Sequence, residues 1–408
     1  MPRLSVVVLL AVVLAALSLV PAAAAAAPKC SSHGWTTQGK LRKYTQYDAA
    51  AADIAANGGW KKLPGSKAVC GAQLLRDAFV VNSQGLTQPL YVSQLADNSA
   101  VQRIVITVPA KGRDGWMYFT SIYNALQKAG ATYADIDKKK IAIISTQYMN
   151  QADADAGSAR ATDLLFDDVS WSDGAQGRAN AGGGAQLGGD QISSYEVLDK
   201  LIVWAQQRYP NAKRVVVAGH SLGGQAVNRY SVLRKEQLDA VPVYFVAGNP
   251  ASWLWMETSR PRPDANCPGV DDYKFGLSAG MVPYAMADLL RLGRDGMLRR
   301  FAGRNVVLAL GDKDYGAGDP SCQASVQGRS HRNRGMLFVR SITKLLGAFP
   351  AKWSYDQVSG CSHDPMCMWA SELGMLRLFR DGYPGASTRV SKNASAARRR
   401  NELDEEEQ

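Results

Sequence analysis

Histidine is scarce in this chain, and cysteine motifs of the zinc-binding kind are missing. The sequence has four histidines and six cysteines in 408 residues. A structural zinc site typically uses Cys-x-x-Cys pairs, alone or with spaced histidines, and no such pair occurs here. We therefore expect that the protein holds no metal.

Long hydrophobic runs are also absent after the first 27 residues. Arg3 is followed by an apolar stretch over residues 4–20 and by an alanine run that ends at Ala27. This order is typical of a secretory signal peptide. The alternative is a retained membrane anchor, but the apolar stretch is at the short end of what spans a bilayer. We therefore expect a signal peptide over residues 1–27, a secreted protein and no stable membrane insertion.

A nucleic-acid recognition motif is missing as well, although the formal net charge of the chain is +11. This charge predicts a basic surface, and an affinity for acidic polymers such as wall polysaccharides stays open. Because no recognition motif accompanies the charge, we do not expect the protein to bind nucleic acid.

The most informative motif that is present is Gly-His-Ser-Leu-Gly at residues 219–223. It follows the apolar run 215–218, and amphipathic helical patterns lie before it at 192–209 and after it at 224–234. A GxSxG motif between a buried strand and a helix is typical of the nucleophile elbow of an α/β-hydrolase. The alternative is an ordinary glycine turn, but the order of the flanking elements favours the elbow, with Ser221 as the nucleophile.

The rest of the chain fits an α/β-hydrolase fold, in which helices flank a mostly parallel central sheet. Apolar stretches at residues 90–95 and 101–108, with a turn at Asp97 to Ser99, predict an antiparallel hairpin at the start of the sheet. The predicted organisation is a signal peptide over 1–27, an N-terminal extension over 28–84, a catalytic domain over 85–386 with insertions at about 150–190 and 257–300, and a disordered charged tail over 387–408.

Four histidines compete for the role of general base, which a serine hydroxyl needs because it is a weak nucleophile near neutral pH. His33 precedes the sheet, and the side chain of His220, inside the elbow, is expected to point away from the base. His331 lies in a polar stretch that indicates an exposed basic patch. His363 follows the predicted strand 353–358, where this fold places its base. We predict His363 as the base, with a structural or metal-binding role as the alternative.

The acid that orients the base must lie between the serine and the histidine in the chain. The apolar strand 305–310 ends in Gly-Asp-Lys-Asp, which contains Asp312 and Asp314. Hydrolase acids usually lie on this loop, commonly three residues after the glycine, so Asp314 is predicted and Asp312 is the alternative. Asp319 precedes a proline and is interpreted as a turn residue.

Two backbone amides are predicted to bind the oxyanion of the tetrahedral intermediate. The first is the amide of Leu222, directly after the nucleophile. The second should come from the loop after the strand 104–108, where the amide of Lys111 is the candidate.

An even number of cysteines in an exported chain predicts three disulfides. The pairing is open from sequence alone. Among the possible pairs we predict Cys361–Cys367 and Cys267–Cys322, because both bonds would close loops near the expected site.

Several stretches of the chain resemble a family of secreted α/β-hydrolase-fold proteins, which are lipase- and esterase-like serine hydrolases, mostly uncharacterised, from fungi and other microbes. The similarity covers roughly residues 85–385. The matching stretches are GRDGWMYF at 112–119, ISSYEVLD at 192–199, VVVAGHSLGGQAVNRY at 215–230, FVAGNPASWLW at 245–255, GDKDY and CQASVQG within 311–328, and SGCSHD at 359–364.

This resemblance implies Ser221 as the nucleophile, Asp314 as the acid and His363 as the base, and it implies no cofactor. The GHSLGG core is shared by lipases and esterases generally, so it indicates fold and chemistry and not the substrate. Lys111 fits less well, because Pro109 stands where the family has a histidine.

Two functions from different classes follow. The first is a secreted, monomeric serine hydrolase that cleaves small-molecule or polymeric carboxylic esters through an acyl-enzyme. The second is a catalytically silent scaffold of the same fold that acts as a secreted binding or effector protein. The complete Ser-Asp-His set favours the enzyme. Two interpretations stay open for three tryptophans: they line an apolar acyl pocket, or they pack in the core. These are Trp171, Trp253 and Trp255.

Overall fold

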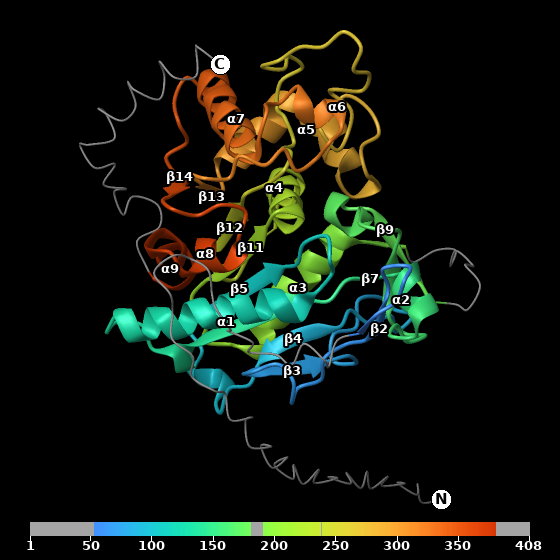
Figure 1. Ribbon diagram of the computed structural model, residues 1–408, viewed down its shortest axis with the longest axis vertical. Helices are drawn as coiled ribbons and strands as arrows, with labels where there is room; N and C mark the ends of the chain where they lie inside the picture. Colours follow the sequence, from blue (N-terminus) through green and yellow to red (C-terminus); the bar gives the residue numbers. More distant parts are fainter. Residues whose placement is uncertain (1–52, 181–190, 238, 381–408) are drawn as a thin grey trace, which may run out of the picture.

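A mostly parallel sheet with helices on both faces forms the body of the protein (Figure 1). The computed structural model describes residues 53–180, 191–237 and 239–380. The predicted signal peptide, residues 1–27, and the predicted tail, 387–408, lie outside the described residues. None of the helices in the described ranges is both long enough and apolar enough to span a membrane.

The strands are β1 Asp53–Ile54, β2 Trp60–Lys62, β3 Ala72–Leu75, β4 Leu90–Ser93, β5 Arg103–Val108, β6 Ile141–Thr146, β7 Met149–Asn150, β8 Leu164–Phe166, β9 Gln176–Ala179, β10 Ile192–Ser193, β11 Val215–His220, β12 Val243–Gly248, β13 Asn305–Gly311 and β14 Trp353–Val358. The α-helices are α1 Gly115–Thr132, α2 Gln151–Ala156, α3 Ser194–Arg208, α4 Leu222–Leu233, α5 Pro283–Ala302, α6 Cys322–Ser325, α7 His331–Leu346, α8 Pro365–Ala370 and α9 Glu372–Phe379.

Within the described residues, the main sheet has eight strands in the order β14-β13-β12-β11-β5-β6-β4-β3. Pairing is parallel from β14 through to β6, while β4 is antiparallel to both β6 and β3. Parallel strands end at the same edge of a sheet, and the loops at that edge commonly form the binding site of an open α/β fold. The topology therefore places the segments after β5, β11, β13 and β14 at one edge.

The predicted hairpin between residues 90–95 and 101–108 is wrong. Both edges of β5 are occupied by the parallel strands β11 and β6, and β4 pairs with β6 and β3 instead. The connection contains a 3₁₀ turn at Asn98–Ala100, where the Asp97 side chain accepts a hydrogen bond from the Ser99 amide. The turn residues thus cap a short helical turn, and they do not form a tight hairpin.

The core consists of two layers because the central strands are apolar on both faces, as is typical of parallel sheets. Val215 and Val217 of β11 belong to the layer that contains α3, α4, α5 and α7. Val216 and Ala218 belong to the opposite layer, which contains α1, α8 and α9. Figure 1 shows these two groups of helices on opposite sides of the strands.

The segment after β6 forms a second small sheet of β7, β8, β9 and β10. Trp171, in the short 3₁₀ helix Ser170–Asp173, is buried in the core and stacks on Tyr148 with ring centroids 4.6 Å apart. Asp173 binds the fully buried guanidinium of Arg229 in α4 at 2.7 Å. The ion pair therefore anchors the described part of the region predicted as an insertion, at about 150–190, to α4. The predicted domain boundaries stay predictions.

Trp253 and Trp255 are fully buried core residues. Trp253 stacks on Phe338 of α7 with ring centroids 4.7 Å apart. Its backbone N–H donates to Oε1 of Gln327 at 2.9 Å, and its carbonyl accepts from Nε2 of the same side chain at 2.8 Å. Of the two interpretations of these tryptophans, the structure favours core packing.

The variant Trp253→Ala is expected to lose about 3–5 kcal/mol of unfolding free energy, because it removes a buried aromatic side chain and leaves a cavity. Urea unfolding of the purified protein measures this loss. Leu290→Ala, at a side chain that is 78% exposed, serves as the control and should change stability by less than about 0.5 kcal/mol. A Trp253→Ala protein of unchanged stability but altered acyl-chain preference would instead indicate a substrate pocket.

Candidate active site

Ser221 lies in a strained turn between β11 and α4. Its backbone has φ 58° and ψ −122°, a conformation that residues with a side chain rarely adopt. The Ser221 amide donates to the carbonyl of Gly248 at the end of β12, at 2.9 Å, which ties the turn to the neighbouring strand. The turn presents the serine side chain at the carboxyl edge of the sheet.

The two glycines of the motif are required by close backbone packing. A Cβ atom on Gly219 would lie 2.2 Å from the carbonyl oxygen of Gly223, and one on Gly223 would lie 2.4 Å from the carbonyl oxygen of Val108. Both distances are far shorter than any real contact of a Cβ atom. The packing also places the start of α4 directly against the end of β5.

Ser221, His363 and Asp314 form a continuous hydrogen-bonded chain. Nε2 of His363 lies 2.8 Å from Oγ of Ser221, and Nδ1 of His363 lies 2.7 Å from Oδ2 of Asp314. A carboxylate can only accept a hydrogen bond, so Nδ1 carries the hydrogen and Nε2 is free to accept the serine proton. The three residues follow β11, β13 and β14, and they meet at the edge that the parallel topology predicts.

Burial raises the pKa of Asp314, but the close contacts and charges of His331 and His363 outweigh burial and lower the pKa to about 2. The carboxylate is therefore ionised at every pH near neutrality. A buried carboxylate beside an imidazole stabilises the imidazolium that forms when the imidazole accepts a proton.

Asp312, the alternative acid, has a different contact. Its Oδ1 accepts a hydrogen bond from the backbone N–H of Gly360 at 2.8 Å. It therefore holds the loop that leads from β14 to His363. Asp319 accepts a hydrogen bond from the Ser321 amide at 3.0 Å, which is a local turn contact.

His331 is not part of an exposed patch, so that interpretation is wrong. It is the first residue of α7 and is buried. Its Nδ1 lies 3.1 Å from Oδ1 of Asp314, and its ring centroid lies 4.2 Å from that of His363. Ser330 is the N-cap of α7, and its side-chain oxygen accepts a hydrogen bond from the Asn333 amide. The helix therefore begins at His331, next to the loop after β13 that carries Asp314, which we call the acid loop. This cap signal was available in the sequence.

The expectation for His220 is also wrong, because its ring lies beside His363, the predicted base, and does not point away from it. Its ring centroid lies 4.6 Å from that of His363. Burial, followed by the neighbouring charge of His363, holds the pKa of His220 well below its ordinary value, so the ring is neutral. Nε2 of His220 lies 3.2 Å from Nδ2 of Asn249, at hydrogen-bond distance.

Asn249 is a residue that the sequence interpretation missed. It has φ 44°, directly after β12. Its Nδ2 also donates to the carbonyl of Ser362 at 3.1 Å, and its Oδ1 accepts from the Gly311 amide at 2.7 Å. One side chain thus joins the ends of two strands to the loop that carries His363. The available signal was an asparagine, which tolerates positive φ, at the end of a buried strand.

The two predicted oxyanion donors lie in adjoining segments. Leu222 is the first residue of α4, so its amide has no partner within the helix. Lys111 has an exposed side chain and lies in the loop between β5 and α1. Arg113 fixes this loop with φ 53° and two hydrogen bonds, of 3.1 and 2.9 Å, to the buried carboxylate of Asp153. The roles of both amides stay predictions.

Cys267 bonds to Cys322, and Cys361 bonds to Cys367, as predicted. The second bond closes the segment that contains His363, and it joins the end of that loop to α8. Cys70 is also disulfide-bonded. Because disulfides persist in oxidising compartments, these bonds are consistent with an extracellular protein.

Among the described residues, one group of side chains could together hold a metal ion: Asp314, His331 and His363. Their possible ligand atoms lie within 4.8 Å of one another. These are residue types that bind zinc and similar ions. In the structure, however, Nδ1 of His363 hydrogen-bonds to the Asp314 carboxylate. A metal at this point would have to replace that hydrogen bond.

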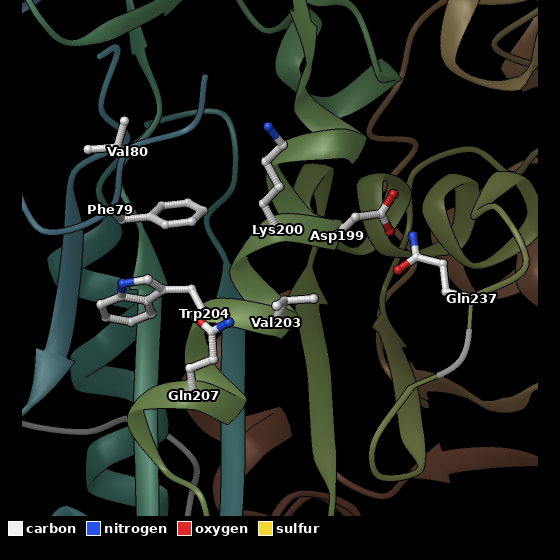
Figure 2. A pocket seen from close by; sticks show the side chains of 8 residues that line it. All are labelled: Phe79, Val80, Asp199, Lys200, Val203, Trp204, Gln207 and Gln237. Atoms are coloured by element: carbon white, nitrogen blue, oxygen red, sulfur yellow. The ribbon is translucent and has the colours of Figure 1, made fainter. Parts of the chain in front are cut away.

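Surface cavities open in the described part of the chain, and two of them differ in their relation to the site. One of about 440 Å³ is lined by Lys111, Gly112 and Arg113 together with the turn between β1 and β2. The other, of about 370 Å³, is lined by Phe79, Trp204 and Asp199 among others, and it contains no predicted site residue (Figure 2). The Asp199 carboxylate is already engaged by two tyrosine hydroxyls, at 2.7 and 2.8 Å.

No protein-family model matches the sequence, and no curated protein matches it significantly. The structure is similar to that of a poly(3-hydroxybutyrate) depolymerase from Bordetella parapertussis, with a TM-score of 0.51 and 17% sequence identity over 80% of this chain and 94% of that chain. This chain has the α/β-hydrolase fold. The predicted fold class is therefore confirmed.

Two further solved structures show weaker likeness. A poly(aspartic acid) hydrolase-1 from Sphingomonas sp. KT-1 has a TM-score of 0.48 and 16% identity over 73% of this chain and 94% of that chain. A siderophore hydrolase from Aspergillus nidulans has a TM-score of 0.41 and 13% identity over 76% of this chain and 95% of that chain.

Proposed function

We propose that this protein is a secreted serine hydrolase that cleaves carboxylic esters through an acyl-enzyme. The observation that carries the proposal is the hydrogen-bonded chain from Ser221 through His363 to Asp314, with distances of 2.8 and 2.7 Å, at a strained elbow turn. A binding scaffold has no need for a serine, an imidazole and a buried carboxylate in this alignment.

In the proposed reaction, Nε2 of His363 accepts the proton of the Ser221 hydroxyl while Oγ attacks the ester carbonyl. The amides of Leu222 and Lys111 would bind the negative oxygen of the tetrahedral intermediate. The imidazolium, stabilised by Asp314, then gives its proton to the leaving alcohol. Water attacks the acyl-enzyme with the same imidazole as base, and the free acid and Ser221 are released.

The substrate class proposed is small-molecule or polymeric esters, on which the protein would act as a monomer. Ser221 is half-buried, and the side chain of His363 is 34% exposed, so the site is open to solvent. The fold shared with a polyester depolymerase makes a polyester film a suitable addition to a screen of soluble esters that differ in acyl length.

A fluorophosphonate probe tests the proposal, because it reacts covalently with an activated serine. The folded wild-type protein is expected to be labelled, and Ser221→Ala is expected to lose the label completely. Ser362→Ala, at an exposed serine beside His363, is the matched control and should be labelled like the wild type.

Gel fluorescence and intact mass measure the labelling, and heat-denatured wild-type protein gives the background. If the folded wild type takes up no more label than this background, the proposal fails. That result would favour the silent scaffold.

A further inference from the structure

We propose that His331 is a positioning residue for the proposed hydrolase. It holds the second carboxylate oxygen of Asp314 and contacts the ring of His363, so that the imidazole stays aligned between Asp314 and Ser221. This inference rests on the proposed function, and it assigns a role to a histidine outside the Ser-Asp-His set.

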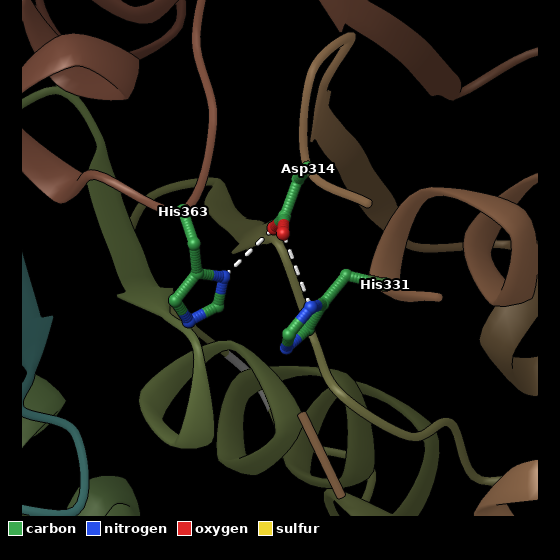
Figure 3. A group of neighbouring side chains, drawn as sticks. All are labelled: Asp314, His331 and His363. Atoms are coloured by element: carbon green, nitrogen blue, oxygen red, sulfur yellow. Dashed lines mark hydrogen bonds and ion pairs between the residues drawn. The ribbon is translucent and has the colours of Figure 1, made fainter. Parts of the chain in front are cut away.

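The Asp314 carboxylate is shared between two imidazoles (Figure 3). Oδ2 lies 2.7 Å from Nδ1 of His363, and Oδ1 lies 3.1 Å from Nδ1 of His331. The side chains of Asp314 and His331 are 1% and 5% exposed, so water has little access to Oδ1. Neither Oδ1 of Asp314 nor Nδ1 of His331 forms a hydrogen bond within the described residues, so their 3.1 Å approach is an electrostatic contact between two buried groups. Removing His331 would take this contact away from a buried charged oxygen, which is costly in a low-dielectric environment.

The ring of His363 contacts two other imidazole rings. Its side chain is 34% exposed, more than those of Asp314 and His331, so it depends on these contacts for its position. The rings of His331 and His220 lie 4.2 and 4.6 Å from it, centroid to centroid. His331 therefore limits the rotation of both partners in the hydrogen bond between Asp314 and His363.

His331 is itself held firmly by the acid loop. Its backbone N–H donates to the carbonyl of Gly316 at 2.9 Å, and the next amide, of Arg332, donates to the carbonyl of Asp314 at 3.2 Å. A Cβ on Gly318 would lie 2.2 Å from Nε2 of His331, so the loop fits closely around the ring. Helix α7 and the acid loop thus form one unit around the carboxylate.

Three substitutions separate the Nδ1 contact from the ring. His331→Phe keeps a ring and removes the polar contact with Asp314, His331→Ala removes both, and His331→Asn places a polar amide where Nδ1 stood. We expect kcat to fall by about 100-fold in the Phe and Ala variants, because small misalignments of reacting groups have effects of this size. In His331→Asn the fall should stay within about tenfold.

The split between kcat and KM distinguishes positioning from a merely structural role. In the Phe and Ala variants kcat should fall while KM stays near the wild-type value, because His331 aligns the reacting groups and is not proposed to contact the substrate. Arg329→Gln, at an exposed side chain two residues away, should keep the wild-type kcat and KM. Thermal unfolding confirms that each variant is folded, and any folded variant without the Nδ1 contact gives the test.

Labelling of the wild type by the fluorophosphonate probe is measured first, and its absence would overturn the proposed function itself. If the wild type is labelled but the folded Phe or Ala variant keeps its kcat, the positioning role is overturned. Loss of wild-type activity after EDTA treatment would also overturn it, because the cluster would then act as a metal site.

Discussion

Replacing His363 with alanine is expected to lower kcat for p-nitrophenyl ester hydrolysis by about 10⁶-fold. In the proposed reaction the His363 imidazole, whose Nε2 lies 2.8 Å from Oγ of Ser221, accepts the serine proton, and the hydroxyl is a very weak nucleophile without it. The remaining rate would come from substrate binding and the oxyanion donors alone. Steady-state kinetics with the purified variant measures the effect.

Two controls make this result interpretable. The His363 side chain is partly exposed, so its removal should leave the unfolding transition close to that of the wild type. Ser362→Ala changes the adjacent residue and should keep wild-type kcat. An activity of His363→Ala near that of the wild type would refute the assignment of the base and make His331 the next candidate.

The second large effect is expected at the acid. Asp314→Asn should lower kcat by about 10⁴-fold, because a neutral amide does not stabilise the imidazolium and does not select the reactive tautomer. Since the pKa of Asp314 is about 2, the wild-type carboxylate stays charged throughout the pH range of the assay. Ionisation of Asp314 itself therefore contributes no pH dependence to this loss near neutral pH.

Asp312→Asn is the matched control for this prediction. Its amide oxygen can still accept the Gly360 N–H that Oδ1 of Asp312 now accepts at 2.8 Å, so kcat should fall by less than about tenfold. The two variants are compared with the same ester and buffer. A larger loss at Asp312 than at Asp314 would reverse the choice between the two carboxylates.

Much of the fold was predictable because its signals are local. The apolar runs 215–218 and 305–310 stand out in the sequence, and each is found within a buried parallel strand. The hairpin between 90–95 and 101–108 was not predictable. Strand pairing depends on which edges are free in the assembled sheet, and β5 has parallel neighbours on both edges.

The residues proposed for catalysis were likewise predictable where their signals are local or follow from the order of the strands. The elbow around Ser221 is formed within one strand, one turn and one helix, and the steric demand for Gly219 and Gly223 follows directly from that turn. The predicted base and acid lie where they can meet the serine, because parallel strands end at one edge of the sheet. These inferences need only the order of elements along the chain.

By itself, the sequence determined the nucleophile candidate, the fold class and a short list of partners, since few histidines were available. Only the tertiary structure decided what surrounds them. His331 of α7 contacts Asp314, and His220 of β11 contacts His363. Asn249, after β12, holds the loop that carries His363. All three contacts join segments that are far apart in the chain. Such contacts depend on how helices and loops pack over the sheet, which no local pattern of residues encodes.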